Sequence, residues 1–135
     1  MKLEHQALSE NIIGAAITVH TALGPGFVEQ VYENALCVEL QTRGVPLQRQ
    51  LSVPIAYRSI EVGLHRLDLV VDDRLVVELK AVKAIEHIHF AIVRPYLNAV
   101  ALDHALILNF AKTTLEIKRV GRLPFDSLPG FLGSG

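Results

Sequence analysis

Several features that would point to particular classes of protein are scarce in this sequence. It contains a single cysteine, Cys37, which excludes an internal disulfide and favours a reducing compartment. A membrane-spanning helix needs about 18 consecutive apolar residues, and no such run occurs. The first residues also lack the apolar segment of a signal peptide. We therefore expect a soluble, cytoplasmic protein that does not associate with membranes.

An excess of charge of one sign is missing as well. The chain has 13 Lys and Arg against 14 Asp and Glu, for a formal net charge of −1, so no global positive field attracts it to nucleic acid. Any contact with nucleic acid must use a local patch, although scattered cations are otherwise a solvated surface. The cations that could form such a patch are Arg43, Arg49, Arg58, Arg66, Lys80 and Lys83.

The chain shows no internal repeat, low-complexity tract or linker that would divide it. With 135 residues, half of them hydrophobic, it can bury one sizeable core. We assign a single domain to residues 1–122. Residues 123–135, where Pro and Gly recur without a period, are predicted to form a loosely ordered tail.

The most strongly patterned stretch runs from Arg66 to Val82. On both sides of Asp72-Asp73 its odd-numbered positions are apolar, which is the period of two expected of strands with one face on a core. The even-numbered positions carry Arg66, Asp68, Glu78 and Lys80. We therefore predict a β-hairpin with charges on one face and six apolar residues on the other. These six are Leu67, Leu69, Val71, Leu75, Val77 and Leu79.

The length of the hairpin loop decides whether Asp68 and Glu78 meet. Opposed residues of an antiparallel pair point to the same face, so a two-residue loop would place Val77 opposite Asp68. A three-residue loop, Asp72 to Arg74, places Glu78 there instead and keeps all six apolar residues on one face. We predict the odd loop or a bulge. Two carboxylates that face each other repel, and a divalent cation between them is the simplest remedy.

Two helices are predicted before this hairpin. Ser9 can cap the first, which Gly24-Pro25-Gly26 ends, and the second runs from about Phe27 to Arg43. Glu29 lies on the apolar stripe of the second helix, three residues before Tyr32. Spacing alone leaves two interpretations open: Glu29 caps or solvates the first turn, or it is a functional carboxylate directed inward.

Strands and one more helix account for the rest of the domain. Alternation predicts an antiparallel strand from Val45 to Tyr57, and Pro54 marks it as an edge or bulged strand. A strand from Ile60 to Val71 follows, with a bulge at Gly63. After the hairpin we predict a helix over residues 85–100, kinked at its internal proline, and strands over residues 104–110 and 115–120.

Asp68 followed by Glu78-Leu79-Lys80 resembles the active-site hairpin of the PD-(D/E)XK nuclease superfamily. The stretch from Gly26 to Tyr32 matches the signature of the small bacterial GxxExxY family within that superfamily. The likeness runs from about Asn11 to Val120 and includes Leu108-Asn109-Phe110. It implies an α/β fold with a restriction-endonuclease-like core, in which helices flank a twisted mixed sheet.

The resemblance also implies a metal-dependent nuclease that hydrolyses phosphodiester bonds, with DNA as the favoured nucleic acid. Asp68 and Glu78 would bind Mg²⁺ or Mn²⁺, with the Leu79 carbonyl and Glu29 as further ligands. Lys80 would orient or deprotonate the attacking water. Tyr32 is better explained as a packing aromatic with a tethered hydroxyl than as a catalytic group. The candidates for substrate binding are Tyr32, Arg66, His89 and Tyr96.

One position departs from the family pattern. The helix after the hairpin usually carries a Gln three residues after a His and four before a Tyr. His89 and Tyr96 match, but Ile92 occupies the position of the Gln, and Pro95 precedes the Tyr. We expect this change to weaken turnover more than metal binding. The alternatives are a catalytically degenerate module that binds nucleic acid or a protein, and a homo-oligomeric scaffold, for which a homodimer is the simplest form.

Overall fold

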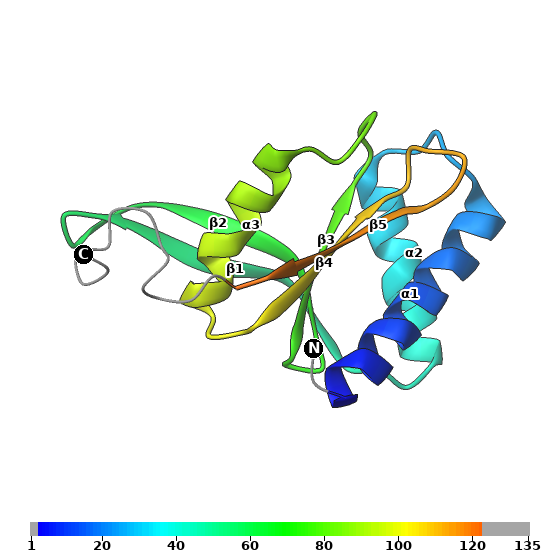
Figure 1. Cartoon of the computed structure of the whole chain (residues 1–135), viewed down its shortest axis with the longest axis horizontal. Coiled ribbons are helices and arrows are strands. Elements are labelled where there is room, and N and C mark those ends of the chain that lie inside the picture. The colour runs from blue at the N-terminus through cyan, green and yellow to red at the C-terminus, as the bar shows by residue number, and fades with distance from the viewer. Residues whose placement is uncertain (1–2, 123–135) are drawn as a thin grey trace.

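The computed structural model describes residues 3–122 (Figure 1). The loosely ordered tail predicted for residues 123–135 lies outside this part of the chain. Three helices and five strands follow one another in the described residues. They are α1 Leu3–Leu23, α2 Glu29–Thr42, β1 Leu47–Tyr57, β2 Ile60–Val71, β3 Leu75–Lys80, α3 His87–Ala99, β4 His104–Asn109 and β5 Glu116–Gly121.

The five strands form one sheet in the order β1-β2-β3-β4-β5. The central pair β3 and β4 is parallel, because α3 carries the chain back between them, and the other pairs are antiparallel. Figure 1 shows α1 and α2 on one face of the twisted sheet and α3 on the other. The predicted α/β fold, a twisted mixed sheet flanked by helices, is confirmed.

Each face of the sheet has its own core. One core joins α1 and α2 to the odd-numbered residues of the hairpin, such as Leu69 and Val77. The other core joins α3 to even-numbered residues of the hairpin, such as Val70 and Val76. Strand β3 is central and covered on both faces, so its apolar residues outnumber its polar ones. No helix within residues 3–122 combines the length and the apolar character that crossing a membrane requires.

The hairpin loop has the predicted length. Val71 pairs with Leu75, which leaves Asp72, Asp73 and Arg74 as the loop. Asp72 and Asp73 both have positive φ, 52° and 54°, as the central residues of a type I′ turn do. The Arg74 amide closes this turn by donating to the Val71 carbonyl at 3.0 Å. The register derived from the apolar pattern is therefore confirmed.

The prediction that all six apolar residues share one face is wrong for Leu67. Five of them lie in the core under α1 and α2, whereas Leu67 lies in the core under α3. The reason is an interruption in the pairing of β1 with β2. Gln50 and Asp68 lie opposite each other but are not paired, and Gln50 has φ +53°. Beyond this point the odd-numbered residues of both strands face the core under α3 instead of the core under α1 and α2.

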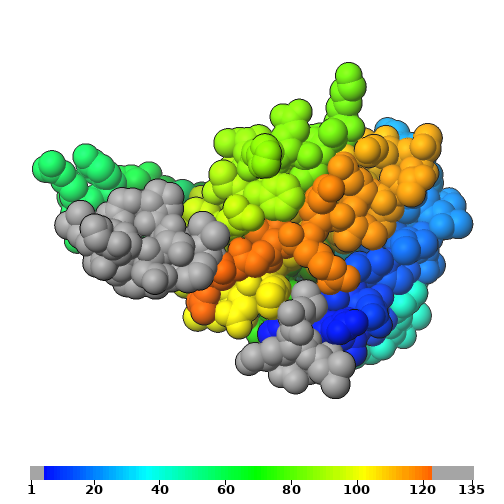
Figure 2. Space-filling view, in the orientation of Figure 1, coloured from blue at the N-terminus to red at the C-terminus, as the bar shows by residue number. Residues whose placement is uncertain are grey.

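Strands β1 and β2 continue well beyond the rest of the sheet. Strand β3 pairs only with Leu69 to Val71 of β2, so the distal part of the β1–β2 hairpin projects from the body as an arm (Figures 1 and 2). Strand β1 is an edge strand, as Pro54 predicts, and a bulge follows Ile55, which pairs with Gly63.

The start of α1 differs from the prediction. The helix begins at Leu3, and Ser9 lies inside it instead of capping it. Leu8 extends the apolar stripe N-terminally by one turn from Ile12, and both are buried in the core. The buried Ser9 hydroxyl donates to the Gln6 carbonyl at 3.1 Å and accepts from Arg119 of β5 at 2.9 Å. Ser9 therefore connects α1 to the far edge of the sheet.

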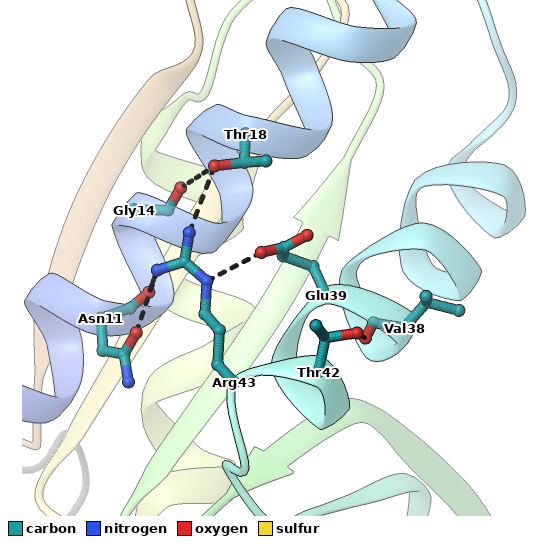
Figure 3. A network of polar contacts seen from close by, with 7 residues as sticks. All are labelled: Asn11, Gly14, Thr18, Val38, Glu39, Thr42 and Arg43. Carbon is teal, nitrogen blue, oxygen red and sulfur yellow. Dashed lines mark hydrogen bonds and ion pairs between the residues drawn. The ribbon is translucent and has the colours of Figure 1, made fainter.

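Arg43, a predicted member of a basic patch, instead joins α1 to α2 (Figure 3). At the C-terminus of α2, its Nε donates to Glu39 at 2.9 Å. Its two terminal nitrogens donate to Asn11 Oδ1 at 3.0 Å and to Thr18 Oγ1 at 3.2 Å, both on α1. All three nitrogens are thus engaged within the protein, and they connect the C-terminus of α2 to α1.

Candidate active site

Asp68 and Glu78 meet where β2 separates from β3. The backbone pairing of the two strands ends at Leu69 and Val77. Beyond it, the Asp68 amide donates to Glu78 Oε1 at 3.2 Å, and the Leu79 amide donates to Asp68 Oδ2 at 2.8 Å. Side-chain carboxylates therefore take the place of backbone carbonyls in the next rung, and the two acids lie side by side at the base of the arm.

The environment of this pair disfavours two negative charges. Burial, followed by the Asp68 carboxylate, raises the pKa of Glu78 to about 8. Burial also raises the pKa of Asp68, and the Glu33 and Glu29 carboxylates of α2 raise it further. The ammonium of Lys80 lowers the pKa of both acids without reversing these shifts. The pair is therefore short of positive charge, and a bound cation would compensate for it.

Lys80 lies at the end of β3, where its backbone is fixed by β4. It pairs with Asn109, and its carbonyl accepts from the Phe110 amide at 2.9 Å. Its side chain is half-buried and close enough to His65 of β2 to lower the pKa of that imidazole, after burial itself. The ammonium thus acts on the pKa values of His65 and of both carboxylates.

Glu29 is directed toward this site. It is the first residue of α2, and its Oε1 accepts from the Ala81 amide, immediately after β3, at 3.2 Å. Although its side chain is exposed, it lies close enough to Asp68 to raise the pKa of that acid. Glu29 thus contacts the end of β3, and its role as a functional carboxylate stays a prediction.

The donor set fits a hard divalent cation through two carboxylates. Carboxylate oxygens suit Mg²⁺ and Mn²⁺, and Mg²⁺ is commonly held by one or two of them together with water or phosphate. The predicted set of three is not assembled: within residues 3–122, no group of three or more His, Cys, Asp or Glu side chains is placed to hold a metal ion. Glu29 contacts the Ala81 amide instead.

Tyr32 is fully buried, so the prediction that it contacts substrate is wrong for this structure. Its ring stacks on Phe110 with centroids 4.6 Å apart. Its hydroxyl donates to the Gly24 carbonyl at 2.6 Å and accepts from the Phe27 amide at 3.1 Å. Tyr32 therefore fixes the turn between α1 and α2, and with it the start of the helix that carries Glu29.

Tyr96 of α3 packs against the core on the face of the sheet that α3 covers. Its ring stacks on His65 of β2 with centroids 3.9 Å apart and planes 6° apart, and Lys80 acts on the same imidazole. Ile92 lies one turn earlier on α3 and is 41% exposed. Ile92 and Pro95, the two positions that depart from the family pattern, are therefore both exposed on α3.

Arg66 and His89 have different surroundings. Arg66 is exposed on β2, two residues before Asp68, and pairs with Ser52 of β1. His89 is engaged in capping α3, because its Nδ1 accepts from the Glu86 amide at 2.8 Å.

The sequence analysis missed Glu33, which lies one turn after Glu29 on α2. It is only 4% exposed and accepts hydrogen bonds from Arg49 and Gln50 of β1. The spacing of four from Glu29 was a usable signal, since residues four apart share a helix face. Its partners lie on strand β1, and nothing in the sequence indicates that they contact α2.

Asn109 was noted within Leu108-Asn109-Phe110 but given no role. It is fully buried, and its amide exchanges two hydrogen bonds with the backbone of Val82, at 2.8 Å and 3.1 Å. A third bond, at 3.0 Å, joins it to Glu116 of β5. Asn109 therefore fixes the segment that follows Lys80, so that the end of β3 is held from both sides.

Comparison with known proteins agrees with this geometry. No curated protein and no solved structure was found to match the chain. The family model of the PD-(D/E)XK nuclease superfamily matches residues 6–120, which covers all three helices and nearly the whole sheet. With an acid on β2, an acid and a lysine on β3 and a match over most of its length, the chain belongs to the PD-(D/E)XK nuclease superfamily.

Proposed function

We propose that the protein is a metal-dependent nuclease that hydrolyses phosphodiester bonds in DNA. The observation that carries this proposal is the pairing of Asp68 with Glu78 at the point where β2 leaves β3. A buried Glu78 and a half-buried Asp68, both with raised pKa values, are costly in a purely structural role. A bound cation, with Lys80 beside it, gives them a function. The match of Gly26 to Tyr32 supports placing the protein in the GxxExxY family.

In this proposal each residue of the site has a separate task. Asp68, Glu78 and the Leu79 carbonyl would hold Mg²⁺ or Mn²⁺, with Glu29 as a further candidate ligand. A bound ion would act as a Lewis acid toward the phosphate and lower the pKa of its water. Lys80 orients the attacking water and offsets the negative charge that develops on the phosphate oxygens.

Substrate contacts would come from the surface around this centre. Arg66 is exposed beside Asp68 and suits a phosphate oxygen. Tyr96, stacked on His65, offers an aromatic edge for a sugar or base, and the free side of His89 offers a second ring nitrogen. We further propose that the protein acts in a bacterial cytoplasm, which its single cysteine and the family resemblance support.

A second candidate function is a binding module of the same fold with weak or lost catalysis. The apolar, 41% exposed side chain of Ile92 favours it, because no amide is present there to hold water or phosphate. Such a module would retain the carboxylate pair and bind metal and DNA without cutting. A homodimer remains a proposal for either function.

Titration calorimetry with Mn²⁺, followed by cleavage of plasmid and oligonucleotide DNA at low salt, tests both functions. Asp68→Ala should abolish Mn²⁺ binding. Lys80→Ala should retain it and lose cleavage. Glu61→Ala, which removes an exposed acid from the arm, is the matched control and should behave as the wild type does. Absence of Mn²⁺ binding by the wild type would refute the nuclease proposal, while binding without cleavage would favour the binding module.

A further inference from the structure

We propose that Glu33 and Gln50 are positioning residues that hold Asp68 in place for the carboxylate pair. The purpose of this positioning rests on the proposed function, whereas the positioning itself can be tested without it. Neither residue is among the groups assigned to the metal, the water or the substrate. Glu33 belongs to α2 and Gln50 to β1, so together they connect a helix to the strand beside Asp68.

The carboxylate of Glu33 is buried and fully used. Its Oε1 accepts from the Gln50 side-chain amide at 2.8 Å. Its Oε2 accepts from Arg49 Nη2 at 2.8 Å and from Arg49 Nε at 3.2 Å. Two neighbouring residues of β1 are thus fixed by one acid, which forms an ion pair with Arg49 at 2.8 Å.

The backbone of Gln50 has an unusual conformation directly opposite Asp68. Its φ of +53° lies in the left-handed region, which residues other than Gly rarely adopt. The pairs on either side, Arg49 with Leu69 and Leu51 with Leu67, show that Gln50 lies opposite Asp68. A strained backbone conformation persists only where surrounding contacts stabilise it. The hydrogen bond from the Gln50 side chain to Glu33 is such a contact.

The strained residue changes where Asp68 points. In a regular strand Asp68 would share the face of Val70, which packs in the apolar core under α3. Because the strands exchange their faces at Gln50, Leu67 takes a place in that core instead. The Asp68 carboxylate turns toward β3, where it accepts from the Leu79 amide at 2.8 Å. Glu33 is close enough to add to the rise in the pKa of Asp68.

The test measures amide hydrogen exchange in the metal-free protein by NMR. In the wild type the Leu79 amide is protected by Asp68, and the Val77 amide in the same strand serves as an internal reference. Gln50→Val disfavours positive φ, and Glu33→Gln removes the charge that binds Arg49. Each should raise the exchange rate of Leu79 relative to Val77 roughly tenfold, as the loss of one hydrogen bond does.

Two further variants separate positioning from general stability. Gln50→Gly accepts positive φ and should restore most of the protection that Gln50→Val loses. Gln48→Val, at an exposed position of the same strand, is the matched control and should change nothing. Unchanged relative exchange of Leu79 in folded Gln50→Val and Glu33→Gln would overturn the inference, and so would a Gln50→Gly variant as deprotected as Gln50→Val.

A parallel Mn²⁺ titration distinguishes this inference from the proposed function. If the wild type binds Mn²⁺, Gln50→Val and Glu33→Gln should weaken binding roughly tenfold and Gln50→Gly much less, in step with the exchange result. If the wild type binds no Mn²⁺, the proposed function fails, and the exchange measurement alone decides whether Glu33 and Gln50 position Asp68.

Discussion

The Asp68 amide donates a hydrogen bond to the Glu78 carboxylate, while the Asp68 carboxylate accepts one from the residue that follows Glu78. Each acid is therefore anchored on the strand of the other. Backbone amides partly stabilise the two charges, but the burial of both side chains outweighs this effect and raises both pKa values. The metal-free site is in consequence a source of pH-dependent instability.

We expect the metal-free protein to lose stability as the pH rises from about 4.5 to about 8. The pKa of Glu78 is raised from 4.5 to about 8 in the folded state, so in this window the unfolded chain releases a proton that the folded chain retains. The free energy of unfolding then falls with pH, by an amount on the order of a few kcal/mol. Urea denaturation between pH 5 and 9 measures it.

Glu78→Gln should remove most of this pH dependence and be the more stable protein at pH 8. Glu61→Gln, at an exposed position of the arm, should keep the wild-type dependence. A Glu78→Gln variant with the same pH profile as the wild type would show that the titration belongs to another group.

Ile92→Gln should raise the rate of DNA cleavage. A missing oriented donor near developing charge costs about 2.7–4 kcal/mol, or roughly a hundred- to thousandfold in rate, and residue 92 is exposed enough to accept an amide at a modest cost in stability. Single-turnover cleavage measures the gain. Ile88→Gln, one turn earlier and also exposed, is the control. A rapid wild type that Ile92→Gln does not improve would mean that another residue fills the role.

Tyr32→Phe should lower the free energy of unfolding by about 1–3 kcal/mol, because the hydroxyl satisfies the Gly24 carbonyl and the Phe27 amide. The stacking on Phe110 is retained, so the cost comes from the hydroxyl alone. Urea denaturation compares it with Tyr57→Phe, an exposed tyrosine on the arm that should cost little. Equal stability of the two variants would show that the turn before α2 does not depend on Tyr32.

Arg43→Lys should also destabilise the protein, by about 1–3 kcal/mol. A lysine keeps the charge but cannot place three nitrogens in the plane that reaches Glu39, Asn11 and Thr18. Thermal denaturation compares it with Arg58→Lys at the tip of the arm. If both variants have the melting temperature of the wild type, the contacts between α1 and α2 do not depend on the guanidinium.

The apolar pattern predicted the hairpin and its register because a one-residue shift would expose the core residues of β2 and β3. The same pattern assigned Leu67 to the wrong face, because it assumes that alternation continues, and the positive φ of Gln50 leaves no mark in the sequence. Five of the six apolar residues assigned to the face under α1 and α2 lie there, and Leu67 lies in the core under α3.

The candidate site residues that the sequence could indicate are those that belong to short local patterns. Asp68, Glu78 and Lys80 follow from the hairpin, and Glu29 from a helix start. Glu33 could not be interpreted, because a buried acid is explained only by its partners, and these lie 16 and 17 residues away. The role of Asn109 likewise depends on Val82, 27 residues earlier in the chain.

The parallel pairing of β3 with β4 also determines when during folding the site becomes complete. The β2–β3 hairpin is local, whereas β3 meets β4 only after the chain has passed through α3, so we expect the hairpin to form before this non-local pairing. Until then Asn109 cannot fix the segment after Lys80, and Glu78 is not buried. We expect a fragment of residues 1–103 to bind no Mn²⁺ in calorimetry, and measurable binding by it would contradict this order. Chains still on the ribosome would accordingly carry all the acids of the site and be inert.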